Sequence, residues 1–465
     1  MSDFGTEELS ARGVRAQARP FSYFDAFVKT FSDAYDRESN PDGYINLAVA
    51  QNNLTVDLLH DRFNDALKEL SPSTTAQYDD MKGSHALRCA MARHMTRRVV
   101  ADDSVEAVRA EDLVLSSGAG AVIENLVFCV CNEGDGVFIP SPYYPAFPND
   151  LRARLGVQTV PVSSTRSSAS RGQVCLPQVG ADYDQAARRR NIEERKDLHI
   201  EERKDLHMKM ILLSNPSNPQ GIIYSREDME ETIVWAVSQK LHVISDEIYA
   251  CSIFGEGGHA FVSAISIVEK LIKDALDRGD AEFAQNCRDY VHVVYGMSKD
   301  FCASGYRVGA LWTQNAGIHR ALDNVSYFCA IPGPMQHALA IVLNDDEFLD
   351  GFFEENRKRL RKQYATVAER IDASVIEIVP TSGMFVYFNL RKYLPEIQPT
   401  YEDEHRLWNH IYTEAKVVLT PGKDCASDEP GWFRMCFAAV PEHTLRQAIE
   451  RIRAAFETIR DSSRC

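Results

Sequence analysis

The chain has 465 residues, of which 45% are hydrophobic and 25% are charged, and its formal net charge is −16. This length fits two or three domains, and so acidic a chain is not expected to bind nucleic acid, because basic surfaces bind phosphate backbones. No apolar run reaches the length of a membrane span, and the first residues lack the basic and then apolar order of a signal peptide. The 11 cysteines are scattered and indicate neither a metal site nor a disulfide framework. We therefore expect a cytoplasmic protein that binds neither membranes nor nucleic acid.

Apolar periodicity divides the chain into alternating helices and strands. A polar segment of about 40 residues comes first, and helical spacing then covers Asp57–Leu70 and His85–Arg98. Short apolar runs, most of them separated by helical patterns, predict six strands, at 114–117, 137–140, 157–162, 210–214, 241–245 and 291–295. This alternation is typical of a largely parallel sheet covered by helices.

The pattern changes after Pro332. A charged helix is predicted over Asp345–Arg370, and strands are predicted at Val375–Val379 and Met384–Asn389. We interpret this part as a smaller α+β domain. The expected division is an N-terminal arm with part of the small domain, a large domain, and the small C-terminal domain, at residues 1–75, 76–330 and 331–465.

One stretch of eight residues occurs twice in tandem. Ile192–His199 reads IEERKDLH, and Ile200–His207 repeats it without change. Its charged composition favours a solvated surface helix, and we assign no chemistry to it.

Chemically distinctive residues follow several of the predicted strands. Asp246 ends one apolar run, with Tyr249 three residues later, and open α/β sheets bind ligands at the carboxyl ends of their strands. Asn218 belongs to "NPSNPQG", in which two Asn-Pro steps force extended or turn geometry. "SSGAGA", residues 116–121, is a turn of small residues into a helix, which suits a bound anion. Each motif alone also fits a structural role, as a capping carboxylate or a plain loop.

Three further stretches contain unusual single residues. "GMSKDFCASGYR" places Lys299 among small residues at the end of a strand, with Arg307 eight residues later. "PSPYYPAF" holds Tyr144 on a stiff loop, where an aromatic ring can stack on a flat heterocycle. Arg434 lies inside an apolar strand, and its planar fork suits a carboxylate. In this order and spacing, the motifs together describe a pocket for pyridoxal phosphate and an amino-acid carboxylate.

The same motifs closely resemble those of the class I/II aminotransferase family of fold-type-I pyridoxal-phosphate enzymes, and within it most of all the 1-aminocyclopropane-1-carboxylate synthase group. The resemblance spans about Asn40 to Ala438 and is carried by "NPDGYINLAVAQNNLTVDLL", "PSPYYPAFPNDLR", "NPSNPQG", "SDEIYA", "GMSKDFCASGYRVG" and "PGWFRMCFA". It implies an α/β fold, with a mostly parallel central sheet in the large domain and a smaller α+β C-terminal domain. It also implies a pyridoxal 5'-phosphate cofactor, an amino-acid substrate and a homodimer with shared active sites.

The resemblance further implies three catalytic residues. Lys299 would form the Schiff base with the cofactor's aldehyde and then carry protons. Asp246 would pair with the N–H group of the cofactor's pyridinium ring. Tyr249, together with Asn218, would hydrogen-bond the ring's phenolate oxygen and help to lower the pKa of the imine.

The remaining roles that the resemblance implies are cofactor and substrate binding. Tyr144 would stack on the ring, and Tyr78 would reach the phosphate of the other subunit. Arg434 would bind the substrate's α-carboxylate. The phosphate would be held by the amides of Ala119, Gly120 and Ala121 and by the side chains of Ser298 and Arg307.

Three positions depart from the synthase group. Gln51 replaces a glutamate, which would be worth a few kcal/mol to the sulfonium cation of S-adenosylmethionine. Gly296 replaces a serine, and Met81 replaces a tyrosine. We therefore predict an enzyme that removes the substrate's α-proton to give a quinonoid intermediate and that is an aminotransferase, with Gln51 in the substrate site. The alternatives are a C–S lyase that eliminates a β or γ group, a 1-aminocyclopropane-1-carboxylate synthase, and a non-catalytic binding protein that has kept the fold.

Overall fold

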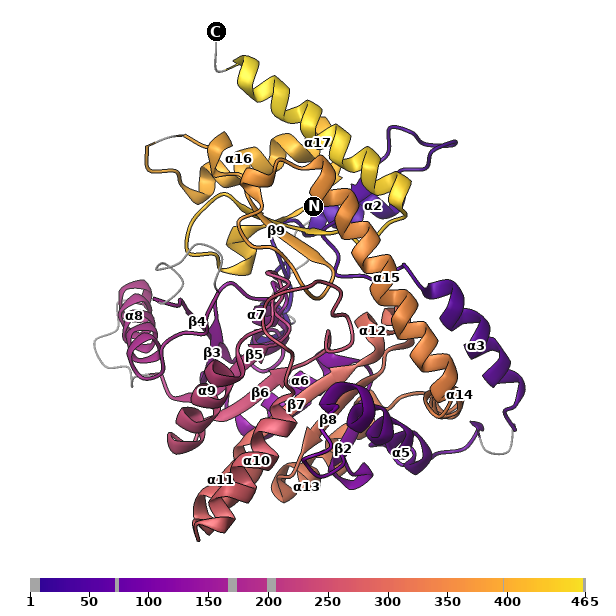
Figure 1. The fold of residues 1–465 in the computed structure, drawn as a ribbon. Coiled ribbons are helices and arrows are strands. Elements are labelled where there is room, and N and C mark those ends of the chain that lie inside the picture. The colour runs from indigo at the N-terminus through magenta and orange to yellow at the C-terminus, as the bar shows by residue number, and fades with distance from the viewer. Residues whose placement is uncertain (1–8, 72–74, 166–173, 199–205, 396, 463–465) are drawn as a thin grey trace.

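The structure is a computed structural model that describes residues 9–71, 75–165, 174–198, 206–395 and 397–462 (Figure 1). A seven-stranded sheet lies at the centre of the larger part, in the order β2-β8-β7-β6-β5-β3-β4. Neighbouring strands from β4 to β7 are parallel, whereas β8 is antiparallel to both β2 and β7. The strands are β2 Leu113–Ser116, β3 Gly136–Pro140, β4 Gln158–Val162, β5 Met208–Ser214, β6 His242–Asp246, β7 Val291–Gly296 and β8 Gly309–Thr313.

The six strands predicted for this part are confirmed, and one strand was missed. β8 follows the turn that contains Arg307, and it begins with a glycine, which strand patterns disfavour. The strand forms because it pairs in antiparallel orientation with β2 on one side and β7 on the other. This pairing depends on the tertiary structure, so the local sequence pattern did not predict it. The α/β fold with a mostly parallel central sheet, as predicted, is therefore confirmed.

Helices cover both faces of this sheet. One face packs against α5, α9, α10 and α14, and the other against α6, α7 and α13, because each set shares a separate cluster of buried apolar residues with the strands. The helices of this part are α3 Val56–Lys68, α5 His85–His94, α6 Ala119–Val130, α7 Phe147–Arg152, α8 Ala181–Leu198, α9 Arg226–Ser238, α10 Ala264–Asp277, α11 Ala281–Tyr290, α12 Met297–Asp300, α13 Ala316–Val325 and α14 Gly333–Leu343.

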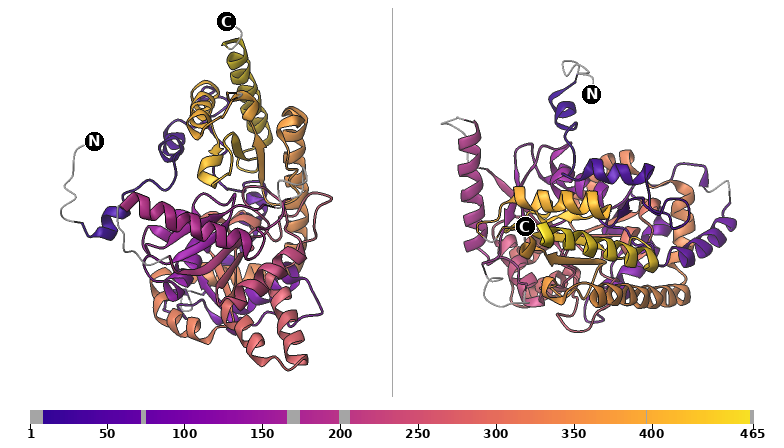
Figure 2. Two further views of the ribbon diagram at one scale, coloured as in Figure 1. Left: turned by 90° about the vertical axis from the view of Figure 1, so that its left-hand side faces the viewer. Right: turned by 90° about the horizontal axis from the view of Figure 1, so that it is seen from above.

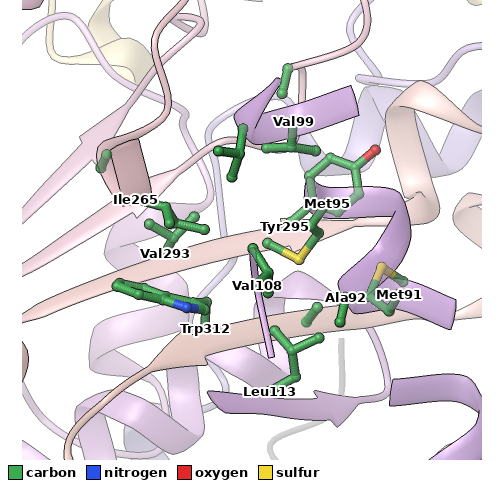
Figure 3. Close-up of a cluster of buried hydrophobic side chains, with 14 of the residues drawn as sticks. Met91, Ala92, Met95, Val99, Val108, Leu113, Ile265, Val293, Tyr295 and Trp312 are labelled. Carbon is green, nitrogen blue, oxygen red and sulfur yellow. The ribbon is translucent and has the colours of Figure 1, made fainter. Parts of the chain in front are cut away.

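Alternation along the strands sorts the apolar side chains between the two faces. Val293 of β7 and Trp312 of β8 are paired and lie in the same cluster, with Met91 and Met95 from the region of α5 (Figure 3). Val294, the next residue of β7, belongs to the cluster on the opposite face. Burial on both faces explains why these strands are nearly continuous apolar runs.

A smaller α+β part lies above the large sheet in Figures 1 and 2 (left). Its antiparallel sheet has the order β11-β12-β9, and a parallel pair joins β1 to β10. The elements are α2 Phe24–Ser32, β1 Ile45–Asn46, α15 Asp346–Arg370, β9 Phe385–Asn389, α16 Tyr401–His410, β10 Val417–Val418, β11 Thr420–Pro421, β12 Trp432–Cys436 and α17 Glu442–Ser462. The short helix α1 Ala11–Arg15 lies against the larger part, because Arg15 donates hydrogen bonds to the carbonyl of Ala153 and to Glu133.

The predictions for this part are partly correct. The charged helix and the strand ending at Asn389 are confirmed as α15 and β9. The strand predicted at Val375–Val379 is wrong, because a short 3₁₀ turn covers Ala373–Val375 and no strand follows until β9. Val375 is 3% exposed and packs in the core of the smaller part, whereas Val379 is 61% exposed, so this stretch leaves the core instead of continuing along it as a strand.

The tandem repeat falls at the end of α8. The first copy extends along this helix to Leu198, and residues 199–205 of the repeat lie outside the described residues. In the described part of the chain, no helix is long and apolar enough to cross a membrane. The same residues contain no group of three or more His, Cys, Asp or Glu side chains that could hold a metal ion.

Candidate active site

A cavity of about 250 Å³ lies at the carboxyl ends of the parallel strands. Ser214 and Asp246 are the last residues of β5 and β6, and α12 follows directly after β7. Figure 1 shows α12 at that edge of the large sheet, on the side that faces the smaller part. Parallel strands bring their carboxyl ends to the same edge, so residues far apart in the sequence meet there.

Most of the predicted cofactor residues line this cavity. They come from the start of α6, the loop before α7, the ends of β5 and β6, and the segment that follows β7. The predicted residues in the lining are Ala119, Gly120, Tyr144, Asn218, Asp246, Tyr249, Ser298, Lys299 and Arg307.

The amine of Lys299 is held against the smaller part of the molecule. Its Nζ donates a hydrogen bond to the backbone carbonyl of Ala50. Burial lowers the pKa of Lys299 from 10.5 to about 8; the nearby guanidinium of Arg434 also lowers this pKa, while Cys436 and Asp246 oppose the shift. About a tenth of the amine is therefore neutral at pH 7, and the neutral form is the one that can act as nucleophile or base.

Asp246 is a buried carboxylate without a cationic partner. Its side chain is 6% exposed, and the Ile248 N–H group donates to Oδ1 at 3.3 Å. Burial raises the pKa of Asp246 from 3.8 to about 7, while this hydrogen bond and the amine of Lys299 lower it. No ion pair of Asp246 occurs among the described residues. A cationic group entering the cavity would supply the missing charge.

Arg434 connects β12 to the cavity through Asn218. Arg434 Nη1 donates to Asn218 Oδ1 at 2.9 Å, and Asn218 Nδ2 donates to the hydroxyl of Tyr249 at 3.4 Å. The other partners of this guanidinium are the carbonyl of Ala48 and the hydroxyl of Thr420, both neutral. Arg434 is 1% exposed, and in the described part of the chain its Nε has no hydrogen-bond partner. Its charge is therefore uncompensated, as a site for a carboxylate requires.

An anion can be held where α6 begins. No side chain caps this helix, and its first N–H groups belong to the predicted phosphate-binding residues, Ala119, Gly120 and Ala121. Arg307 Nη2 lies beside them and donates to the carbonyl of Ser117 at 3.2 Å. Gly118 has φ +92°, and a Cβ atom there would lie 2.3 Å from Arg307 Nη2. Only glycine allows the guanidinium to approach the helix so closely.

Four predicted residues do not line the cavity, and one of them is Arg434, which contacts Asn218 of the lining. The side chain of Ala121 lies outside it. Gln51 lines a different cavity, together with residues of α2, and its Nε2 donates to Asn53 Oδ1 at 2.8 Å. Tyr78 is 89% exposed, which leaves it on the surface of this chain.

The sequence predictions also missed residues at the site. Asp150, on α7, lines the cavity, and burial raises its pKa from 3.8 to about 7, with further increases from Glu124 and Asp246. Tyr23 is 4% exposed and accepts a hydrogen bond from Thr420, beside Arg434. Asp150 stands directly after the tyrosine loop, which was a usable signal, whereas nothing in the sequence around Tyr23 indicates its position.

These features match the chemistry of pyridoxal phosphate. The helix start and Arg307 can hold the phosphate, and the uncompensated carboxylate of Asp246 can hold a protonated ring nitrogen. Tyr144 can cover the ring, and the amine of Lys299 has the lowered pKa that covalent attachment to an aldehyde needs.

Comparison with known proteins identifies the class of protein. A family model described as aminotransferase class I and II matches residues 42–452. The 1-aminocyclopropane-1-carboxylate synthase 6 of Oryza sativa subsp. japonica is 31% identical over 469 aligned residues, covering 98% of this chain and 79% of the relative. The synthase 7 of Arabidopsis thaliana is 32% identical and covers 92% and 91%. The chain therefore belongs to the class I and II aminotransferase family.

Solved structures agree with this fold. A Thermus thermophilus aspartate aminotransferase mutant complexed with tryptophan has a TM-score of 0.70 at 22% identity, covering 96% of this chain and 99% of the other. An aromatic aminotransferase from Pyrococcus horikoshii has a TM-score of 0.64 at 20% identity, covering 89% and 96%. These structures show the fold, and the family and the synthase relatives show a pyridoxal-phosphate-dependent enzyme, an aminotransferase or a lyase.

Proposed function

We propose that this chain is an aminotransferase that transfers the amino group of an α-amino acid. The observation that carries the proposal is that two groups without an ion pair among the described residues, the carboxyl group of Asp246 and the guanidinium of Arg434, both lie near the amine of Lys299, whose pKa is lowered. These groups suit a cationic ring nitrogen, a substrate carboxylate and a proton carrier.

Each residue then has a defined task in the reaction. Pyridoxal phosphate supplies an aldehyde that joins amines covalently and a ring that withdraws electrons from the substrate's α-carbon. Arg434 binds the substrate carboxylate, and Asn218 orients both this guanidinium and the hydroxyl of Tyr249. The neutral amine of Lys299 would accept the proton of the substrate's α-carbon and later release it, and the carboxylate of Asp246 would hold a protonated ring nitrogen.

The position of Gln51 supports transamination over ring closure. A synthase must bind the sulfonium cation of its substrate, and the resembling group carries a glutamate at this position. Gln51 is neutral, and its side chain is hydrogen-bonded to Asn53 in a separate cavity. A neutral amide offers a cation only a dipole, which is a smaller gain than a carboxylate would give.

A second candidate function is 1-aminocyclopropane-1-carboxylate synthase, because relatives with that name are 30–33% identical over nearly the whole chain. One experiment separates the candidates: the enzyme with bound cofactor is mixed with single amino acids plus a keto acid, or with S-adenosylmethionine, and the products are identified. We expect a new amino acid and a new keto acid. Pyruvate plus a thiol would show a C–S lyase, and the cyclopropane amino acid as main product would contradict our interpretation of Gln51.

We also propose a homodimer in which Tyr78 reaches the partner's active site. The 89% exposure of this tyrosine supports the proposal, and the molar mass in solution, together with the cofactor affinity of Tyr78→Phe, tests it.

The division into residues 1–75, 76–330 and 331–465 is likewise a proposal, supported by the pairing of β1 with β10 and testable by limited proteolysis. We further propose a cytoplasmic location, which cell fractionation tests.

A further inference from the structure

A second cavity, of about 210 Å³, lies in the smaller part of the molecule. It is enclosed by the end of α15, the strands β9 and β12, and α17, and it shares no lining residue with the active-site cavity. α15 and α17 pack against each other along this part, and both are visible in Figure 1. The inner wall is apolar and is formed by Phe388, Met435, Ile449 and Ile452.

Two arginines stand in the lining of this apolar cavity. Arg370 ends α15, and Arg453 lies on α17. The Nε atom of Arg370 is buried and has no hydrogen-bond partner among the residues that the structure describes. Neither arginine forms an ion pair in the described part of the chain. A buried guanidinium nitrogen without a partner costs free energy, which an anion bound at this place would offset.

Two acidic residues line the same cavity and do not neutralise the arginines. Asp372 forms an ion pair with Lys392, which together with Ser374 holds the pKa of Asp372 well below its usual range. Glu457 is exposed, and within the described residues it is paired with neither arginine. With Asp372 already paired, the guanidinium of Arg370 remains open to an anion from solution.

We propose that this cavity binds a small amphipathic carboxylate, with the apolar body against Phe388, Ile449 and Ile452 and the carboxylate on Arg370 and Arg453. The combination of an apolar lining with a few converging polar groups is typical of ligand sites. The volume suits a ligand with about ten non-hydrogen atoms, smaller than the occupants of drug-sized pockets.

The second cavity also lies next to β12, the strand that carries the proposed substrate-binding residue Arg434. Arg434 and Met435 are consecutive on β12, and consecutive strand residues point to opposite faces. Arg434 faces Asn218 at the reaction centre, whereas Met435 lines the second cavity. The proposed ligand is therefore separated from the substrate carboxylate by the thickness of one strand.

The test is a calorimetric titration of the full chain with bound cofactor, using phenylacetate, and phenethylamine as a cation of similar size. Phenylacetate can also bind at Arg434, so the cofactor's absorbance is recorded to identify that event. We expect a second event per chain that leaves the absorbance unchanged and that phenethylamine does not produce. Filling the cavity with Ile452→Trp should abolish this event. The double variant Arg370→Gln, Arg453→Gln should weaken it at least tenfold.

Arg446→Gln is the matched control, because Arg446 lies on the same helix but is paired with Glu442 outside the cavity. It should leave the second event unchanged. The proposal would be overturned if phenylacetate gave only one binding event and that event changed the cofactor's absorbance. It would also be overturned if the second binding event persisted in the double glutamine variant, or if phenethylamine produced the same event. The glutamine changes are nearer the surface, so they decide the question if Ile452→Trp does not fold, which circular dichroism reports.

Discussion

The buried carboxylate of Asp246 should destabilise the protein when the cofactor has been removed. The folded chain keeps this carboxyl protonated up to about pH 7, whereas the unfolded chain releases the proton near the ordinary pKa of 3.8. Between these values the folded state binds more protons, so its stability falls as the pH rises. Asp246→Asn removes this loss, because an amide of the same shape does not titrate.

The expected size of the effect follows from the two pKa values. The shift from 3.8 to about 7 makes the asparagine variant more stable than the wild type by about 2 kcal/mol at pH 5 and about 4 kcal/mol at pH 8. Denaturant unfolding of both proteins without cofactor measures the difference at each pH. Asp274→Asn, an exposed change on α10, is the control and should show no such trend.

Adding pyridoxal phosphate should reduce the stability difference between the two proteins. The cofactor's ring nitrogen supplies the missing cation to Asp246, and a hydrogen bond to a charged group is worth about 1.5–3 kcal/mol. The asparagine variant should therefore bind the cofactor about 10- to 100-fold more weakly. The reasoning is refuted if the wild type is the more stable protein at pH 8 without cofactor, or if the difference does not change between pH 5 and pH 8.

Three further substitutions test the rest of the site. Gly118→Ala should weaken cofactor binding at least tenfold in an absorbance titration, because the new methyl group displaces Arg307, whereas Gly305→Ala, which meets no atom within 4 Å, should not. Equal affinities would contradict the anion site at α6. Arg434→Lys should raise KM for the amino acid by about tenfold or more and change kcat less, because an ammonium group cannot bind the carboxylate with two parallel hydrogen bonds. An unchanged KM in steady-state assays would disprove the assignment of Arg434 to the substrate site. Lys299→Ala should abolish turnover and the covalent attachment that borohydride fixes, and retention of both would disprove its role.

The sequence was sufficient wherever a motif and its neighbours lie together in the chain. Asp246 and Tyr249 are three residues apart at a strand end, so predicting β6 also placed both side chains at the edge of the sheet. Lys299 follows β7 in the same way. The apolar runs were recognisable because these strands are buried on both faces.

The errors concern features that depend on partners elsewhere in the chain. β8 forms because it pairs with both β2 and β7. The stretch that ends at Val379 does not form a strand because it pairs with no neighbouring strand in the described part of the chain. Tyr23 reaches Thr420, a hydrogen-bond partner of Arg434, only because the N-terminal segment packs into the core of the smaller part. The direction of the Gln51 side chain depends on the path of the preceding residues, which no local pattern specifies.

That path also explains how the two parts of the molecule form one site. Leu47 forms hydrogen bonds with two strands of the smaller part. Its N–H group donates to the carbonyl of Val418 on β10, and its carbonyl accepts from the N–H group of Cys436 on β12. The carbonyl of Ala48 then accepts from Arg434 of the smaller part, and the carbonyl of Ala50 accepts from Lys299 of the larger part. Backbone groups, not side chains, therefore set the spacing between the amine and the guanidinium. Small residues suffice at these positions, and for that reason no side chain of Ala48 or Ala50 indicates in the sequence that this segment aligns the reacting groups.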